Sequence, residues 1–394
     1  MSNTSRLTYL TSVGLNHDPF ATPVAEQETS SVEDIPVFYS YYLQPAFFTG
    51  NQELSEKDLR QSEKNFFIYG EPGDGKTTLR LAIEAECRTR VEKTLVVSYL
   101  LGEDLKNPLT LEEHGDRLAK AIAIDLFIQI VEQYDLFETP PNKKLIEALR
   151  KQVALGGRHI SRLMRLILDN SMPNARAGIG AYWQTVGKAA VKYVPKTEDV
   201  VKLLQNCLDD PAERSVLTGW DLVQQGIHAA RLWGFKRLLV MVDGVDTRHR
   251  TIKDMLALIK PLFGKLPGLA AQDIYFRFFL PTELQAKIEQ VLGASRLPNY
   301  LYMPIIIKWR EDALRRLLAQ RFFAAGSHLQ GFEALAERNL DIDDKLVTAA
   351  NGSPRRLLRL ASDLVDVHVA RRGPGDLRIS QSDWDKIQNL TQRD

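Results

Sequence analysis

Runs of apolar residues along the chain mark five candidate buried strands. Each run is followed by turn residues or by apolar residues at helical spacing, which is the pattern of strands that alternate with helices. Such alternation predicts an α/β fold with a mainly parallel sheet. The runs fall at about residues 65–70, 94–101, 237–243, 274–281 and 300–307.

Two longer stretches carry helical periodicity instead. Between roughly residues 105 and 232 the apolar positions recur at helical spacing with few strand signals, which predicts an all-α insertion. Helical spacing returns from about 308 to 372, where Ser353 is the predicted N-cap and Pro354 the first residue of one helix.

A glycine-rich segment, FFIYGEPGDGKTTLR at 66–80, separates the first strand from a predicted helix. It fits the pattern G-x-x-x-x-G-K-[ST], in which backbone N–H groups and a helix N-terminus surround phosphate oxygens. Lys76 is expected to contact the β- and γ-phosphates, and the Thr77 hydroxyl to ligate Mg²⁺. The predicted nucleotide-binding residues of this loop are Gly70, Gly73, Gly75, Lys76, Thr77 and Thr78.

A second carboxylate for the metal is expected at the end of the run RLLVMVDGVD. Its apolar part predicts a central parallel strand, so Asp243 should lie at the carboxyl edge of the sheet, near a Mg²⁺-bound water. Gly244 follows where many P-loop ATPases carry a water-polarising glutamate. Either Asp246 or Glu71 takes that role, or hydrolysis is slow and the nucleotide acts as a switch; we favour slow hydrolysis.

These motifs define the expected ligands and domains. The segment NKKL at 142–145 lacks the aspartate of the guanine-reading N-K-x-D element, so ATP with Mg²⁺ is the expected ligand. The aromatic stretch 37–50 either packs on the core or forms a platform near the base. The predicted domains are an N-terminal segment (1–63), a P-loop ATPase core (64–104 and 233–307), a helical insertion (105–232) and a helical lid (308–394).

Composition adds little to this assignment. The 394 residues contain 51 Lys and Arg against 50 Asp and Glu, so overall charge indicates no nucleic-acid or membrane partner. The two cysteines lie far apart without a CxxC pair, which argues against a disulfide scaffold or a zinc site. Without a signal-peptide pattern or an apolar run of spanning length, we expect a cytoplasmic protein with no transmembrane segment.

Local charge is more informative, because the stretch from 150 to 196 is strongly basic. Three partners are open: nucleic-acid phosphates, an acidic protein or neighbouring subunit, and a membrane surface contacted by an amphipathic helix at 178–194. A solvated helix face is the remaining interpretation. The basic residues are Arg150, Lys151, Arg158, Arg162, Arg165, Arg176, Lys188, Lys192 and Lys196.

Together the motifs resemble those of an AAA+ ATPase. The quoted segments are GEPGDGKTT, LLVMVDGVD, FRFFLPTEL, SRLPNYLYM and GSPRRLL. The combination is most similar to origin-recognition and transposon target-selection ATPases and to the signal-transducing STAND ATPases. It covers roughly residues 35–104 and 233–370 and leaves out the helical insertion.

The resemblance implies further roles. Thr282 corresponds to a sensor 1 residue that positions the attacking water. Arg355 corresponds to the lid arginine that reaches the γ-phosphate, with Arg356 as the adjacent candidate. Arg296 lies where the family's arginine finger would be supplied to a neighbouring subunit, which requires an oligomer. Arg277, in the middle of a strand among aromatic residues, is predicted to be a stacked structural arginine instead.

Three functional hypotheses follow. In the first, an ATPase whose nucleotide state controls oligomerisation recruits or activates effector proteins, by analogy within a bacterial defence or mobile-element system. In the second, an ATP-dependent DNA-binding ATPase assembles on duplex DNA and directs a recombinase or nuclease. In the third, the chain is a small-molecule P-loop kinase, which we rank last because no phosphoacceptor pocket is legible.

Overall fold

The computed structural model describes most of the chain. The described residues are 3–21, 41–89, 93–102, 105, 108–134, 142–168, 198–209, 216–247, 249–294, 302–326 and 328–391.

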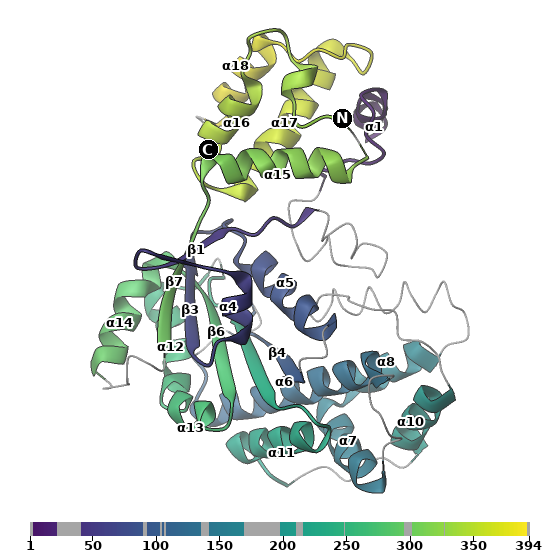
Figure 1. The fold of residues 1–394 in the computed structure, drawn as a ribbon, viewed down its shortest axis with the longest axis vertical. Coiled ribbons are helices and arrows are strands. Elements are labelled where there is room, and N and C mark those ends of the chain that lie inside the picture. Colours follow the sequence, from purple (N-terminus) through teal and green to yellow (C-terminus); the bar gives the residue numbers. More distant parts are fainter. Residues whose placement is uncertain are drawn as a thin grey trace.

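One mixed sheet forms the centre of the molecule (Figure 1). In the described residues its strand order is β2-β1-β7-β3-β6-β5-β4. The five strands from β7 to β4 are parallel, whereas β1 pairs antiparallel with both β7 and β2. The predicted α/β class and the five predicted strands are therefore confirmed. The bounds are β1 Ala46–Thr49, β2 Gln52–Leu54, β3 Asn65–Gly70, β4 Thr94–Leu100, β5 Arg237–Asp243, β6 Ile274–Pro281 and β7 Tyr302–Lys308.

Helices cover both faces of this sheet, since successive side chains of a strand point to opposite faces. In β3, Phe66 and Ile68 belong to the hydrophobic cluster on one face, which also contains Leu79 of α5 (Lys76–Thr89). Phe67 and Tyr69 belong to the larger cluster on the other face. Helices on that second face or flanking it include α12 (Ile252–Phe263), α13 (Leu266–Ala270) and α14 (Gln285–Ala294).

All elements described between β4 and β5 are helices. Their buried side chains join the same cluster as the second face of the sheet, so these helices share a core with it. The longest, α6, also bonds the edge strand, because Gln129 Nε2 donates to the Val96 carbonyl (2.9 Å) and Asp125 accepts from the Ser98 amide (2.9 Å). The helices are α6 Leu111–Glu132, α7 Lys143–Gly156, α8 Arg158–Leu168, α10 Glu198–Asp209 and α11 Gly219–Leu232.

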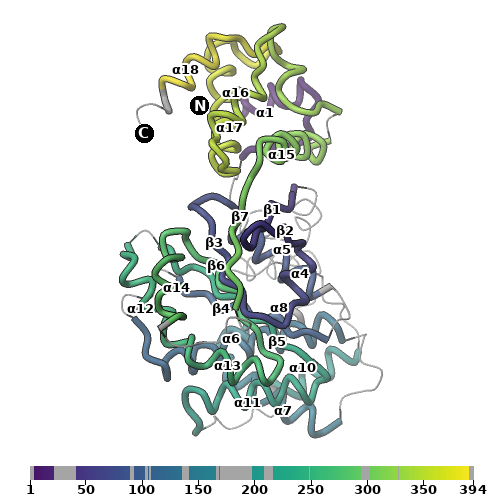
Figure 2. Tube along the Cα trace, turned by 60° about the vertical axis from the view of Figure 1, so that its left-hand side comes forward, coloured from purple at the N-terminus to yellow at the C-terminus, as the bar shows by residue number. Residues whose placement is uncertain are grey.

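A separate hydrophobic cluster holds the helices that follow β7, at one end of the molecule (Figure 2). The N-terminal helix α1 (Asn3–Ser12) belongs to it, with Tyr9 and Leu10 buried there. Arg6 fastens this helix by an ion pair with Asp18 (2.6 Å) and a bond to the Ser362 carbonyl (3.0 Å). No pattern in the sequence predicted that α1 shares a core with the helices that follow β7. The later helices are α15 Glu311–Ala324, α16 Ile342–Ala350, α17 Pro354–Arg372 and α18 Gln381–Thr391.

Candidate functional site

The loop between β3 and α5 has the backbone conformation that its glycines permit. Gly73 (φ +103°) and Gly75 (φ +85°) both lie in the left-handed region, where other residues are strained. The Asp74 carboxylate accepts from the Glu71 amide (2.7 Å) and closes the loop on itself. Burial raises the pKa of Asp74, while the bond from Glu71 opposes that shift. The loop therefore ends at the N-terminus of a helix of 14 residues, where amide groups and the helix dipole favour an anion.

Lys76 is the first residue of α5, and its ammonium group lies inside the loop. Its Nζ donates to the carbonyls of Gly70 (2.9 Å) and Glu71 (3.2 Å), and it forms an ion pair with Asp246 (3.1 Å). The lysine is buried, whereas the carboxylate is partly exposed. The structure thus brings together two of the predicted site residues, with the Asp246 carboxylate beside the cation.

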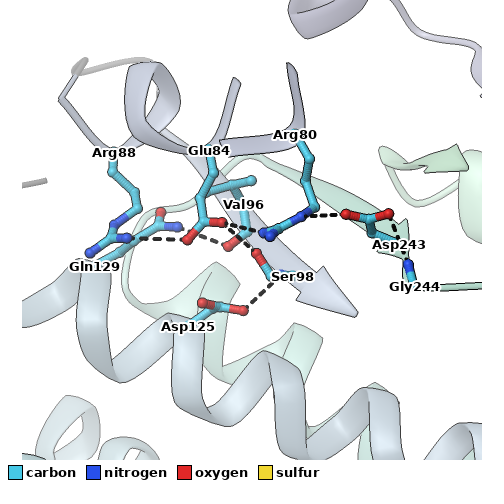
Figure 3. Close-up of polar contacts among 9 residues, drawn as sticks. All are labelled: Arg80, Glu84, Arg88, Val96, Ser98, Asp125, Gln129, Asp243 and Gly244. Atoms are coloured by element: carbon cyan, nitrogen blue, oxygen red, sulfur yellow. Dashed lines mark hydrogen bonds and ion pairs between the residues drawn. The ribbon is translucent and has the colours of Figure 1, made fainter. Parts of the chain in front are cut away.

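Asp243 ends β5, at the carboxyl edge where the sequence predicted it. Its Oδ1 accepts from the Gly244 amide (2.8 Å), and its Oδ2 accepts from Arg80 Nε (2.9 Å) (Figure 3). Arg80 is only 1% exposed and lies one helical turn after Lys76. Sequence reasoning missed this partner, although Arg80, Glu84 and Arg88 recur at a spacing of four on the predicted helix.

Thr282 follows β6, which lies between β3 and β5 in the sheet. The register pairs Gly70 with Pro281, so Thr282 comes next to the start of the glycine-rich loop. Its side chain is partly exposed at this edge. Three predicted residues from three adjacent strands (Lys76 after β3, Thr282 after β6, Asp243 at the end of β5) therefore lie along one edge.

The C-terminal helices contact the loop directly. The Arg355 amide donates to the Gly73 carbonyl (3.4 Å), and a Cβ atom at Gly73 would lie 3.0 Å from the Arg355 Cβ. Ser353 is the N-cap of α17, as predicted, and its hydroxyl accepts from the Arg356 amide (3.4 Å). Both arginines are exposed. A second link is Trp309, whose Nε1 donates to the Asp74 carbonyl (3.0 Å).

A pocket of about 580 Å³ opens beside this contact. Of the aromatic stretch 37–50 only residues 41–50 belong to the described part of the chain, and there Phe47 is fully buried in the core whereas Phe48 lines the pocket. Arg310 lies over the Phe48 ring, 5.4 Å from its centroid. The other lining residues are Gly50, Asn51, Glu71, Asp74, Ile307, Lys308, Trp309, Asn351, Gly352 and Ser353.

Thr77 and Asp243 are the side chains to consider as ligands of a metal ion that keeps most of its bound water. Among the described residues, no group of three or more His, Cys, Asp or Glu side chains could hold a metal. Mg²⁺ bound with a nucleotide needs only one or two protein ligands, because phosphates and waters supply the others. A hydroxyl at Thr77 and a carboxylate at Asp243 fit that requirement.

Several predicted residues lie outside the described part of the chain: Arg296, and the basic residues Arg176, Lys188, Lys192 and Lys196. Of the described basic residues, Arg150 donates to the Asn206 carbonyl (3.0 Å), and Lys151 is exposed beside Glu147. The predicted basic face is clearest on α8. There Arg158, Arg162 and Arg165 are exposed, while Ile160, Leu163 and Met164 are buried.

Comparisons with protein-family models, with curated proteins and with solved structures gave no match to this chain. None of the helices in the described ranges combines the length and the apolar character needed to cross a bilayer.

Proposed function

We propose that the chain is an ATP-binding, slowly hydrolysing ATPase of the AAA+/STAND type, whose nucleotide state controls its assembly and its recruitment of effector proteins. The observation that carries the proposal is the shared edge of β3, β6 and β5. A glycine loop with a buried lysine, a threonine and a carboxylate meet there, beside a helix N-terminus. This is the arrangement that phosphate and a hydrated divalent cation require.

In this proposal each side chain has a defined task. The loop amides and Lys76 bind the phosphates, and Thr77 and Asp243 hold Mg²⁺. The metal, when bound, neutralises charge on the phosphate oxygens. Thr282 orients the attacking water. Asp246 must leave Lys76 when phosphate enters, because both anions compete for one ammonium group.

One feature supports ATP as the nucleotide, and a second feature supports slow hydrolysis. The pocket between Phe48, Trp309 and Ser353 adjoins the loop and has room and an aromatic wall for a purine base. Gly244 offers no side chain to polarise water, and its φ of +75° disfavours any replacement by glutamate.

Nucleotide control of assembly rests on the contact between α17 and the loop. The Arg355 amide donates to the Gly73 carbonyl, so a nucleotide bound in the loop would change the position of the C-terminal helices. Arg355 would reach the γ-phosphate from this side. Arg296 is proposed to act on the ATP of a neighbouring subunit, which would make assembly and nucleotide state interdependent.

A second candidate function is ATP-dependent binding to duplex DNA. The exposed arginine face of α8 favours it, because phosphate recognition requires clustered cations. Lys120, Lys151 and Arg158 also line one pocket of about 420 Å³ next to that face. Charge reversal at Arg158, Arg162 and Arg165 is expected to abolish DNA binding, and wild-type binding should weaken steeply with salt.

Mass photometry tests the proposal, with and without ATP and Mg²⁺, and with and without a plain DNA duplex. We expect larger species only with ATP, and none for Lys76→Ala or Arg296→Ala. Assembly that also requires DNA would favour the second candidate. A wild-type chain that stays monomeric in every condition would contradict nucleotide-controlled assembly and the role of Arg296.

A further inference from the structure

A network of buried charges leads from Asp243 along α5 to Glu132 of α6, and Figure 3 shows its links from Asp243 to Arg88. Arg80 Nε donates to Asp243 (2.9 Å), and its guanidinium also donates to Glu84 Oε2 (3.0 Å). Glu84 Oε1 accepts in turn from Arg88 (3.2 Å). Arg88 Nε donates to Glu132 of α6 (2.8 Å). The signs alternate from Asp243 to Glu132, and none of the five residues is more than 4% exposed.

Asp243, Arg80, Glu84 and Arg88 are each bonded to at least two partners. Glu84 Oε2 accepts from the Ser98 hydroxyl (2.8 Å) as well as from Arg80, which ties α5 to β4. Burial opposes the charge of Arg88, but the carboxylates of Glu132 and Glu84 together raise its pKa, so it stays protonated. Removing one partner from such a network leaves an uncompensated buried charge, which is costly. Arg80 is therefore held in place by Glu84, which is itself bonded to Arg88 and to Ser98.

Asp243 is consequently held from two directions. Gly244 N–H fixes one oxygen and Arg80 Nε fixes the other, while an ionised carboxylate still has lone pairs to accept from further donors. A carboxylate restrained in this way can receive a metal-bound water without losing further rotational freedom. Groups that hydrogen-bond to a metal ligand in this way orient the ligand and tune metal affinity.

We propose that Arg80 is the positioning residue of the metal site: it orients Asp243 toward the Mg²⁺ of the bound nucleotide, anchored through Glu84 and Arg88. The inference rests on the proposed function. In this proposal Arg80 acts on the metal through Asp243 and not on the nucleotide itself, so its substitution should weaken Mg²⁺-dependent ATP binding and leave metal-independent binding unchanged. Lysine at this position keeps the charge but cannot donate to both carboxylates in the fixed geometry of a guanidinium group.

The test is ATP binding by calorimetry over a Mg²⁺ titration and in excess EDTA. For Arg80→Lys we expect the same ATP affinity as in the wild type when EDTA is in excess. The midpoint, which is the Mg²⁺ concentration that gives half of the Mg²⁺-dependent gain in ATP affinity, should rise about tenfold. Arg88→Lys is the matched control, since it makes the same exchange about two turns further along the same helix without touching Asp243. It should lower the melting temperature about as much but move the midpoint far less than Arg80→Lys does, because Arg88 reaches Asp243 only through Glu84 and Arg80. In Asp243→Asn the addition of Arg80→Lys should change nothing further.

Three results would overturn the role of Arg80: an unmoved midpoint in Arg80→Lys, an equal shift in Arg88→Lys, or fully additive effects of Arg80→Lys and Asp243→Asn. If Arg80→Lys does not fold, Glu84→Gln replaces it, because loss of that anchor should raise the midpoint by about threefold; an unchanged midpoint there overturns the proposal as well. Failure of wild-type protein to bind ATP at any Mg²⁺ concentration would instead remove the proposed function.

Discussion

Arg80 and Arg277 are both buried almost completely, and their surroundings differ in kind. Arg80, at the carboxyl edge of the sheet, shares its charge between the carboxylates of Asp243 and Glu84. Arg277, in the middle of β6, donates to backbone carbonyls, among them those of Leu59 and Ser62, and stacks on the Phe66 ring (4.3 Å). Within the described ranges, all hydrogen-bond acceptors of Arg277 are backbone carbonyls.

The two arginines therefore differ in their expected roles: Arg277 supports the fold, whereas Arg80 lies beside the proposed nucleotide site. Carbonyl groups satisfy the donors of Arg277 but do not neutralise its charge, and burial lowers its pKa to about 9. It closes the chain segment before β3, and the prediction of a stacked structural arginine is confirmed. Arg80 instead links acidic groups from separate elements, at the edge where a ligand can enter. Substitutions in the two regions should therefore change different properties.

The largest effect on stability is expected from Arg277→Met. The substitution leaves the carbonyls of Leu59, Ser62 and Lys64 without this donor in a buried site, and should lower the free energy of unfolding by about 3 kcal/mol. Denaturant unfolding measures this loss. ATP affinity of the folded protein should be unchanged; a large loss of affinity would erase the distinction between the two regions.

Arg355→Ala should weaken ATP binding by about tenfold, because it removes one charged hydrogen bond to phosphate. Arg356→Ala is the matched control, since the adjacent residue is equally exposed at the start of α17. Fluorescent-nucleotide titration compares the two variants. Equal effects would show that only general positive charge matters at this helix terminus.

Asp246→Asn is expected to change ATP affinity less than Arg355→Ala does, and to raise it. Its carboxylate pairs with Lys76 at 3.1 Å and competes with phosphate for the ammonium group, so ATP should bind about threefold more tightly. Glu283→Gln removes an exposed negative charge from the same edge and serves as the control. Hydrolysis measured in the same samples shows whether Asp246 orients water: in that case turnover falls although affinity rises.

The smallest expected effect is on the pH dependence of stability, and it comes from His114, a buried group that remains neutral. It contacts the Tyr99 hydroxyl (2.7 Å) and the Leu258 carbonyl (2.7 Å), and burial lowers its pKa. The unfolded state then binds more protons below about pH 6.5, so stability should decrease as pH falls through that value. Melting temperatures between pH 7.5 and 5.5 should show a weaker decrease in His114→Gln than in the wild type. An identical decrease would mean that other groups carry the dependence.

The sequence predicted the parts of this edge that follow local rules. Unbroken apolar runs identified the strands, and glycine spacing identified the loop after β3. The link between Arg80 and Asp243 was not predictable, because the two residues are 163 positions apart and a charge on a helix usually faces solvent. The packing of α1 against the C-terminal helices was missed for the same reason: such pairing depends on tertiary contacts that no local pattern specifies.

The central claim is that the loop after β3 binds ATP together with Asp243. Isothermal titration of ATP into wild-type protein and Lys76→Ala, both in Mg²⁺, tests it most directly. We predict about one ATP per chain for the wild type, and at least about a hundredfold weaker binding for Lys76→Ala at similar thermal stability. Absence of binding by the wild type, or equal binding by the two proteins, would contradict the account.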